Sequence, residues 1–467
     1  MRIAMIGVGY VGLVSGACLA DFGHDVICID KDAKRIAALQ RGCVPFFEPD
    51  LAPLIEHNVR AGRLSFSATL REPVQRADVV FIAVGTPTRS DDGGADLSSL
   101  HEAAREIAAA LRGSTVIVAK STVPVGTGDE IERIIRKAQP DAEFFVVSNP
   151  EFLREGCAVR DFKFPDRVVI GTDDARARRR MEQVYRPLGP RVPLHFTSRR
   201  AAELTKYAAN ALLATKIAFI NEIADLCESA GADVREVARG VGLDSRIGEK
   251  FLQPGPGYGG SCFPKDTLAL AKTAEDHGVT LSLVEAVIAS NEVRKRAMAQ
   301  RIADAMGGRV RGRTVAMLGL TFKADTDDMR ASPALDCIAD LQAMGAQVRA
   351  YDPAGMENAK PLLKHVRFAR DPYECAAGAG ALVVMTEWDE FRGLDLARLR
   401  RAMAQPVLVD LRNIYEPAEA ARHGFAYHGF GRGELKTADA AKPAVTAARR
   451  MRQLPETPLR VARPLSA

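Results

Sequence analysis

The sequence predicts an α/β protein with two doubly wound parallel sheets, joined by a long central helix and a small all-α domain. Short apolar runs alternate with helical patterns over roughly the first 195 residues. The run 199–231 has no Pro or Gly before its final residue, and a second alternation begins near residue 313. The length of 467 residues, with 47% hydrophobic and 26% charged residues, is typical of a soluble globular chain with several cores.

The first predicted unit is a strand, a glycine turn and a helix. Residues Arg2–Ile6 form the strand, and the run 7–12, Gly-Val-Gly-Tyr-Val-Gly, opens the helix. The next predicted strand, Asp25–Asp30, ends in an acid 18 residues past Gly12. In this context the GxGxxG run is the fingerprint of a Rossmann-like dinucleotide-binding domain.

Each part of the fingerprint has a physical task. The first glycine permits a tight turn, the second lets the backbone approach a pyrophosphate, and the third allows close helix–strand packing. The Asp30 carboxylate would accept from ribose hydroxyls and repel a 2′-phosphate, which favours NAD over NADP. Lys31 and Arg35 are close enough in sequence to weaken that preference.

The uncharged run 3–20 superficially resembles a signal peptide. It carries four glycines and continues into a strand pattern, so a strand, turn and helix explain it better and export is not expected. No other apolar run is long enough to span a membrane. The eight cysteines show no CxxC pair and no metal-like spacing, which fits a reducing cytoplasm. Four fall in apolar patterns and are predicted core thiols: Cys18, Cys28, Cys227 and Cys337.

Further strands are predicted in the first domain, which we place at residues 1–195. They are Ala77–Gly85, Thr115–Lys120, Phe144–Val147 and an edge strand, Arg167–Gly171. The loops 85–88, 121–126 and 149–155 follow three of these strands. Ligands of doubly wound sheets bind at the carboxyl ends of strands, so these loops are candidate binding segments.

A central helical domain is predicted at residues 196–308. The run 199–231 would form a connecting helix on the order of 45 Å long, and its apolar girth predicts a dimer seam. Shorter helices are expected at 233–239, 267–278 and 281–306. Within this domain the stretch Gly255–Asp266 is too rich in Gly and Pro for a helix or regular strand. It brings together a thiol, a cation and a carboxylate, namely Cys262, Lys265 and Asp266. Taken alone, it reads equally as a glycine turn with one buried Cys or as a catalytic loop.

A second α/β unit is predicted at residues 309–435. Its strands are Arg313–Leu320, Gln347–Asp352, Ala381–Thr386 and Pro406–Asp410, with a helix from about Pro333. The turn after its first strand lacks GxGxxG, so it would bind a nucleotide-like ligand differently.

The tail 436–467 is predicted to be disordered and basic. Residues 433–467 hold seven Lys/Arg and three Asp/Glu, a net of +4 out of +5 for the whole chain. The body is therefore close to neutral, and no nucleic-acid partner is expected.

Several motifs together closely resemble those of the UDP-glucose 6-dehydrogenase family, from Met1 to about Gly431. They are the N-terminal fingerprint, Gly85-Thr86-Pro87, Ser121-Thr122-Val123-Pro124-Val125-Gly126, the segment 149–155, Gly257-Tyr258-Gly259-Gly260-Ser261-Cys262-Phe263-Pro264-Lys265-Asp266, and the run 322–330. The resemblance implies oxidation of the C6 alcohol of a UDP-sugar to a carboxylate by two NAD, which supplies uronic acid for polysaccharide biosynthesis. A Cys thiolate would add to the intermediate aldehyde, give a thiohemiacetal and then a thioester, and so permit a second oxidation.

The resemblance also implies a role for each matching residue. The catalytic residues would be Cys262 as nucleophile, Lys206 and Asn210 on one helix face, Asp266 and Thr122 holding a water, and Glu155 in acid–base steps. NAD would contact Gly7, Gly9, Tyr10, Val11, Gly12, Asp30, Lys31, Arg35, Thr86, Thr122, Glu155, Lys265 and Arg330. The UDP-sugar would contact Glu151, Phe152, Leu153, Arg154, Glu155, Lys206, Asn210, Arg246, Phe251, Leu252, Gln253, Pro254, Gly255, Gly259 and Lys323, with Arg246 reaching a neighbouring subunit. No metal is expected, and Asp325, Asp327 and Asp328 are interpreted as a solvated loop.

Three alternatives remain open. The substrate could be GDP-mannose or a UDP-N-acetylhexosamine, although Tyr258 and Phe263 favour UDP-glucose. A two-electron dehydrogenase of the 6-phosphogluconate type would need neither Cys262 nor the second α/β unit. A non-catalytic sensor of nucleotide sugars would not need every expected catalytic position to be filled, as it is here.

Overall fold

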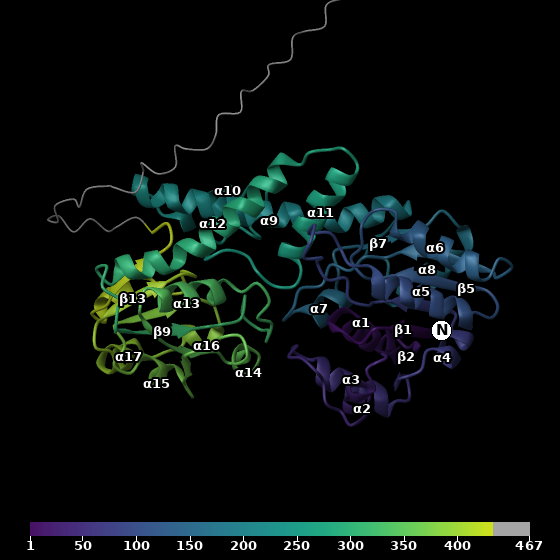
Figure 1. The fold of residues 1–467 in the computed structure, drawn as a ribbon, viewed down its shortest axis with the longest axis horizontal. Coiled ribbons are helices and arrows are strands. Elements are labelled where there is room, and N and C mark those ends of the chain that lie inside the picture. Colours follow the sequence, from purple (N-terminus) through teal and green to yellow (C-terminus); the bar gives the residue numbers. More distant parts are fainter. Residues whose placement is uncertain (433–467) are drawn as a thin grey trace, which may run out of the picture.

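The computed structural model describes residues 1–432 and shows two sheet-containing lobes beneath a layer of long helices (Figure 1). The predicted tail, 436–467, lies outside the described residues. The predicted fold class is confirmed: both sheets are doubly wound, and one long helix runs across the two lobes.

The first lobe holds an eight-stranded sheet of order β3-β2-β1-β4-β5-β6-β7-β8. Its strands are β1 (Arg2–Ile6), β2 (Asp25–Ile29), β3 (Leu64–Ser67), β4 (Val79–Ile82), β5 (Thr115–Ala119), β6 (Phe144–Ser148), β7 (Val168–Gly171) and β8 (Leu194–Thr197). All neighbouring pairs are parallel except β6 and β7. The edge-strand prediction for 167–171 is wrong, because β8 pairs outside β7.

Helices cover both faces of this sheet, so its strands are apolar on both sides. Along β1, Ile3 and Met5 face one core and Ala4 and Ile6 face the other. The first core includes residues of α1 (Tyr10–Asp21), α3 (Leu51–Arg60), α7 (Ala158–Lys163) and α8 (Ala175–Tyr185). The second includes residues of α4 (Arg71–Arg76), α5 (Ser98–Ala110) and α6 (Thr127–Ala138). A short helix, α2 (Ala33–Gln40), follows β2, and a 3₁₀ turn, Arg186–Leu188, follows α8.

The layer of long helices begins with α9 (Arg199–Ala230), as predicted. The Ser198 side chain caps its start by accepting from the Ala201 N–H, and Gly231 ends it with φ +76°. The next helices are α10 (Val234–Gly242), α11 (Phe263–Asp276) and α12 (Ser282–Ala305). The prediction of an irregular stretch up to Asp266 is wrong at its end. Helix α11 starts at Phe263, because Pro is tolerated in a first helical turn.

The second lobe holds a six-stranded, fully parallel sheet of order β11-β10-β9-β12-β13-β14. Its strands are β9 (Thr314–Leu318), β10 (Gln347–Tyr351), β11 (Val366–Phe368), β12 (Ala381–Val384), β13 (Val407–Asp410) and β14 (Ala426–Gly429). Its helices are α13 (Pro333–Ala343), α14 (Met356–Ala359), α15 (Pro372–Ala376), α16 (Asp389–Arg392), α17 (Leu396–Ala402) and α18 (Pro417–Arg422).

The long helices are tied to both lobes. The start of α9 packs against β6 and β7 of the first sheet. Its later residues Ile220 and Ala224 share a core with Met298 of α12 and Val315 of β9. Helix α9 therefore fixes the carboxyl ends of the first sheet relative to the second lobe. None of the helices in residues 1–432 is long and apolar enough to cross a membrane.

Candidate active site

A buried ion pair links helix α9 to the loop after β6. The Lys206 Nζ lies 3.1 Å from Glu151 Oε1, and the exposed fractions of the two side chains are 3% and 5%. The Phe152 ring lies 5.4 Å from the same nitrogen. Burial opposes the charge of Lys206, but the Glu151 and Asp266 carboxylates favour it, so the pKa of Lys206 is raised. Lys206 is thus a buried, charged ammonium and does not extend to the surface.

A second buried pair joins α9 to α11, one helical turn further along. Asn210 Nδ2 donates to Asp266 Oδ2 at 2.6 Å, and Lys265 Nζ donates to Oδ1 at 2.6 Å. Asp266 is buried in the first turn of α11. Because Lys206 and Asn210 are four residues apart, both project from one face of α9, as predicted.

Cys262 immediately precedes α11 and contacts its neighbour Ser261, with Sγ and Oγ 3.5 Å apart. The Ser261 hydroxyl donates to Glu155 Oε1 at 2.7 Å. Burial raises the pKa of the Cys262 thiol to about 11, against the opposing field of Lys206. At neutral pH the resting sulfur is therefore a thiol, and it becomes a nucleophile only as its proton leaves.

Glu155 lies between the two lobes. Its Oε2 accepts from Thr326 Oγ1 at 3.2 Å, Arg330 lies 3.6 Å from its Oε1, and its main-chain carbonyl accepts from the Lys323 ammonium. Burial first, and then the Asp328 carboxylate, raise the pKa of Glu155 to about 7. A carboxyl with that pKa can both accept and return a proton near neutral pH.

The glycines of the Cys262 loop are required by neighbouring protein atoms. A Cβ on Gly259 would lie 2.3 Å from the Ala331 carbonyl oxygen, and one on Gly260 would meet the Phe322 ring at 2.7 Å. The Gly260 N–H also donates to the Arg330 carbonyl at 2.8 Å. The loop therefore docks on the 322–331 segment of the second lobe.

The geometry of the fingerprint turn fits a dinucleotide. Gly7 has φ +97°, and a Cβ there would lie 2.5 Å from the Ala83 carbonyl oxygen. A Cβ on Gly12 would lie 1.9 Å from the Gly7 carbonyl oxygen, which accounts for the close helix packing. Nothing lies within 4 Å of a Cβ on Gly9, so the backbone there is open to a ligand at the start of α1.

The acid at the end of β2 is held close to this turn. Asp30 accepts from the Val8 and Asp32 N–H groups at 3.0 Å each, and Arg35 lies 3.8 Å from it. Lys31 pairs instead with Glu102 at 2.6 Å. The Thr86 hydroxyl donates to the Thr122 carbonyl at 2.8 Å, which joins the loops after β4 and β5.

Other predicted residues have partners within the protein. Arg330 pairs with Asp328 at 2.7 Å, and only 9% of the Asp328 side chain is exposed. The interpretation of Asp328 as part of a solvated loop is therefore wrong. Arg154 pairs with Asp161 at 2.6 Å, and the Leu153 side chain packs on the first core.

The segment 251–255 is held from two helices. Asn221 of α9 accepts from the Gly255 N–H at 2.8 Å, and Arg294 of α12 donates to the Gly255 carbonyl at 2.6 Å. Leu252 and Pro254 are buried, whereas Gln253 is exposed and Phe251 has φ +65°.

Arg246 lies at the exposed end of this region. Its side chain is 87% exposed and pairs with Asp244 at 2.6 Å. Within the described residues, no hydrogen bond or ion pair joins it to the cluster around Cys262.

Sequence reasoning missed the partners that hold these residues. Ser261 is inside the recognised motif and could have been named as a bridge to Glu155. Thr326, Asn221 and Arg294 carry no local signal, because only tertiary packing brings them to the site. The four cysteines predicted as core thiols are buried and unpaired, as expected.

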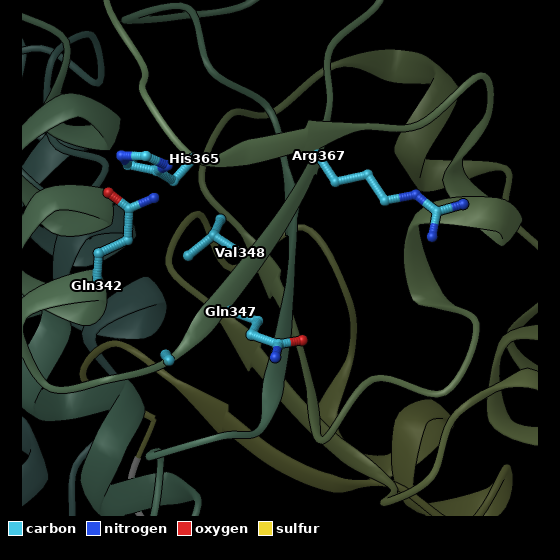
Figure 2. Close-up of a pocket in the computed structure, with 6 residues that line it drawn as sticks. Gln342, Gln347, Val348, His365 and Arg367 are labelled. Atoms are coloured by element: carbon cyan, nitrogen blue, oxygen red, sulfur yellow. The ribbon is translucent and has the colours of Figure 1, made fainter.

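A hollow of about 450 Å³ lies elsewhere, at the β11 edge of the second sheet (Figure 2). Gln342, His365 and Arg367 line it, and none of its lining residues belongs to the cluster around Cys262. Within residues 1–432, no three or more His, Cys, Asp or Glu side chains gather in a way that could hold a metal ion.

Known proteins resemble this chain over nearly its whole length. A UDP-glucose 6-dehydrogenase of Rhizobium meliloti (strain 1021) is 62% identical over 435 residues, which is 92% of this chain and 100% of that protein. UDP-glucose 6-dehydrogenase TuaD of Bacillus subtilis (strain 168) is 46% identical over 93% of this chain and 94% of its own length. The solved structure of a UDP-glucose dehydrogenase from Pyrobaculum islandicum matches with a TM-score of 0.84 at 38% identity, covering 91% of this chain and 96% of that one.

Three family models match consecutive parts of the chain. They describe the NAD binding domain (residues 1–189), the central domain (200–293) and the UDP binding domain (316–417) of one family. The order of these matches follows the first sheet, the long helices and the second sheet. The chain belongs to the UDP-glucose/GDP-mannose dehydrogenase family.

Proposed function

We propose that the chain oxidises UDP-glucose to UDP-glucuronate, consuming two NAD⁺ and one water and releasing two NADH and three protons. The observation that carries this proposal is a cluster in which Cys262 contacts Ser261, Ser261 donates to Glu155, and the buried Lys206 ammonium acts electrostatically on the Cys262 sulfur. The high identity to UDP-glucose 6-dehydrogenases favours UDP-glucose over other nucleotide sugars. We also propose that residues 1–195 bind NAD, 196–308 carry the Cys262 loop, and 309–435 bind the nucleotide sugar.

In the first oxidation, Lys206 and Asn210 would stabilise the negative charge that develops on the C6 oxygen. NAD, when bound, supplies the hydride acceptor. The Phe152 ring and the Glu151 carboxylate hold the Lys206 ammonium, so its charge is already oriented when the alcohol loses its proton.

In the second oxidation, the Cys262 sulfur would add to the aldehyde carbon, and the thiol proton would pass to the aldehyde oxygen to give a thiohemiacetal. The second NAD would supply the hydride acceptor for this adduct, whose hydroxyl proton would go to solvent as the thioester forms. Water, held by Asp266 and Thr122, would attack the thioester carbon while Glu155 takes a proton from that water; Glu155 would then return this proton to the departing sulfur and regenerate the thiol.

A count of NADH per sugar tests this function. We expect two NADH per UDP-glucose, measured by absorbance with limiting sugar, and little turnover of GDP-mannose or UDP-N-acetylmannosamine. One NADH per sugar would indicate an ordinary two-electron dehydrogenase. Activity with only another nucleotide sugar would assign the chain to a different member of its family.

We propose that the protein works as a homodimer in the cytoplasm. Three large apolar side chains recur at seven-residue intervals along one side of α9 and are exposed: Leu212, Phe219 and Leu226. A helical face of this kind needs a partner surface, and a second copy of α9 would supply one. The eight free cysteines favour a reducing compartment.

Phe219→Asp is expected to convert the dimer to a monomer, because a carboxylate would have to be buried at the centre of that seam. Sedimentation velocity would show the mass fall to about half at micromolar concentration. Phe164→Asp is the matched control, since Phe164 is also exposed but lies on the loop after α7. The proposed seam would be contradicted if Phe219→Asp left the mass unchanged. It would also be contradicted if Phe164→Asp lowered the mass as much as Phe219→Asp.

A further inference from the structure

Glu48 is a buried carboxylate between α2 and α3, and the chemistry above gives it no task. It is 7% exposed. Its Oε1 accepts from the Ala158 N–H at 2.7 Å, and its Oε2 accepts from the Gly156 N–H at 2.6 Å. The Tyr10 hydroxyl donates to Oε2 as well. Three donors on one buried carboxylate offset much of its desolvation cost, so this is a built contact rather than a stray surface charge.

The peptide bond between Glu155 and Gly156 is held from two sides. Its N–H donates to Glu48, and its carbonyl accepts from Lys323. The N–H and C=O of a trans peptide point in opposite directions, so the two anchors fix one plane between them. Glu48 belongs to the first lobe and Lys323 to the second.

The segment at Gly156 packs closely against the second lobe. Gly156 has φ +79°, and a Cβ there would lie 2.6 Å from the Asp325 carbonyl oxygen. The peptide is bonded directly to the Glu155 Cα, so its two anchors fix where that Cα lies between the lobes. Displacement of the peptide would therefore carry the Glu155 carboxylate away from Ser261.

We propose that Glu48 is a positioning residue for Glu155: it holds the 155–156 peptide so that the Glu155 carboxylate lies against Ser261, beside Cys262. Through Tyr10, the first residue of α1, it also ties this peptide to the turn where the dinucleotide is expected. The proposal rests on the proposed function for the acid–base task of Glu155. The titratable groups that face Glu155 include Asp328, Arg330, Lys323 and the Tyr10 hydroxyl.

The test is Glu48→Gln in the full chain. Glutamine keeps the length but has one acceptor oxygen, so an amide NH₂ must face one of the donors that Glu48 now satisfies. We expect kcat for UDP-glucose oxidation to fall by about 10- to 100-fold, because a small misplacement of a catalytic group has effects of this size. The KM for UDP-glucose should change far less, since the bonding partners of Glu48, namely Tyr10, Gly156 and Ala158, are not among the expected sugar contacts.

The pH profile separates positioning from mere stabilisation. The pKa of Glu155 is about 7, so kcat of the wild type should rise with pH through about 7 as the base ionises. A loosened carboxylate gains water, and its pKa falls toward the ordinary value of roughly 4.3. The acidic limb should therefore move down by about one pH unit in Glu48→Gln.

Asp174→Ala is the control for stability, because Asp174 accepts from the N–H groups of Arg176 and Ala177 at the start of α8. It removes a carboxylate that accepts from backbone N–H groups in the same lobe, so it should lower Tm without moving the acidic limb of the kcat profile. The proposal would be overturned if Glu48→Gln lowered Tm but left kcat and the acidic limb of its pH profile as in the wild type.

A second readout does not depend on UDP-glucose. The rate of Cys262 alkylation by iodoacetamide rises with pH toward the thiol pKa of about 11. Glu155 contacts Ser261, which contacts Cys262, so ionisation of Glu155 should disfavour the thiolate and add an inflection to this rise near pH 7 in the wild type. The labelled peptide is followed by mass spectrometry, and the inflection should shift in Glu48→Gln. An unchanged profile would overturn the role of Glu48 alone, whereas a wild type that fails to oxidise UDP-glucose would overturn the proposed function alone.

Discussion

Cys262→Ala is expected to stop the oxidation at the aldehyde and to lower the rate of UDP-glucuronate formation by on the order of 10³-fold or more. Without the sulfur no thiohemiacetal can form, and the thiohemiacetal is the species that donates the second hydride. Lys206, Asn210 and the dinucleotide turn remain in place, so the first oxidation should persist. With limiting UDP-glucose the variant should release at most one NADH per sugar, and chromatography should show an aldehyde in place of the acid.

Cys337→Ala is the matched control for this change. Cys337 is a buried thiol of α13 in the core of the second lobe, so its loss should cost stability but leave two NADH per sugar. If Cys262→Ala still forms the acid at a rate near that of the wild type, the sulfur is not the nucleophile. A loss of the same size in both variants would point to damage to the fold rather than to chemistry.

The elements that the sequence predicts correctly are marked by their own residues, either by the placing of Gly and Pro or by a run of apolar side chains. Helix α9 was predicted because its sequence lacks Gly and Pro until Gly231, and that glycine ends the helix in the left-handed region. The strands β1, β2 and β5 are apolar on both faces, because helices cover both sides of the sheet.

The strands that were missed are β3, β8, β11 and β14. Each has only three or four residues and lies at a sheet edge. Such strands are held by backbone pairing to a neighbour more than by apolar burial, so they leave no run of apolar residues. The start of α11 was missed for a different reason: its first residues, Phe-Pro-Lys, read as the end of a loop.

The site was predictable only where its residues share one motif or one helix face. The Lys206–Asn210 spacing could be read from the sequence. The partner of Lys206 could not, because Glu151 is 55 residues away along the chain. Glu48 is 108 residues from Gly156, and only the folded sheet brings the two together. Motifs identify residues that act on ligands, whereas the residues that hold them are set by tertiary packing.

Lys206→Met is expected to lower kcat by about 10²- to 10³-fold, the usual cost of losing a preorganised group that stabilises negative charge in the transition state. Methionine keeps the apolar stem over the Phe152 ring but removes the ammonium. Because Lys206 lowers the pKa of Cys262, its loss should raise that pKa further and slow alkylation of the thiol. Glu151 would be left buried without its cation, which costs about 3–5 kcal/mol of stability.

A double variant separates these two effects. Glu151→Gln added to Lys206→Met removes the unpaired buried charge, so much of the lost Tm should return while kcat stays low. Lys272→Met is the matched control, because Lys272 pairs with Asp276 at the surface of α11, where an ion pair is worth about 1 kcal/mol or less. Recovery of kcat in the double variant would show that Lys206 serves only to neutralise Glu151. Low activity with restored stability, where Glu151→Gln alone stays active, would assign the ammonium to the reacting oxygen, because a purely structural cation is dispensable once its partner is neutral.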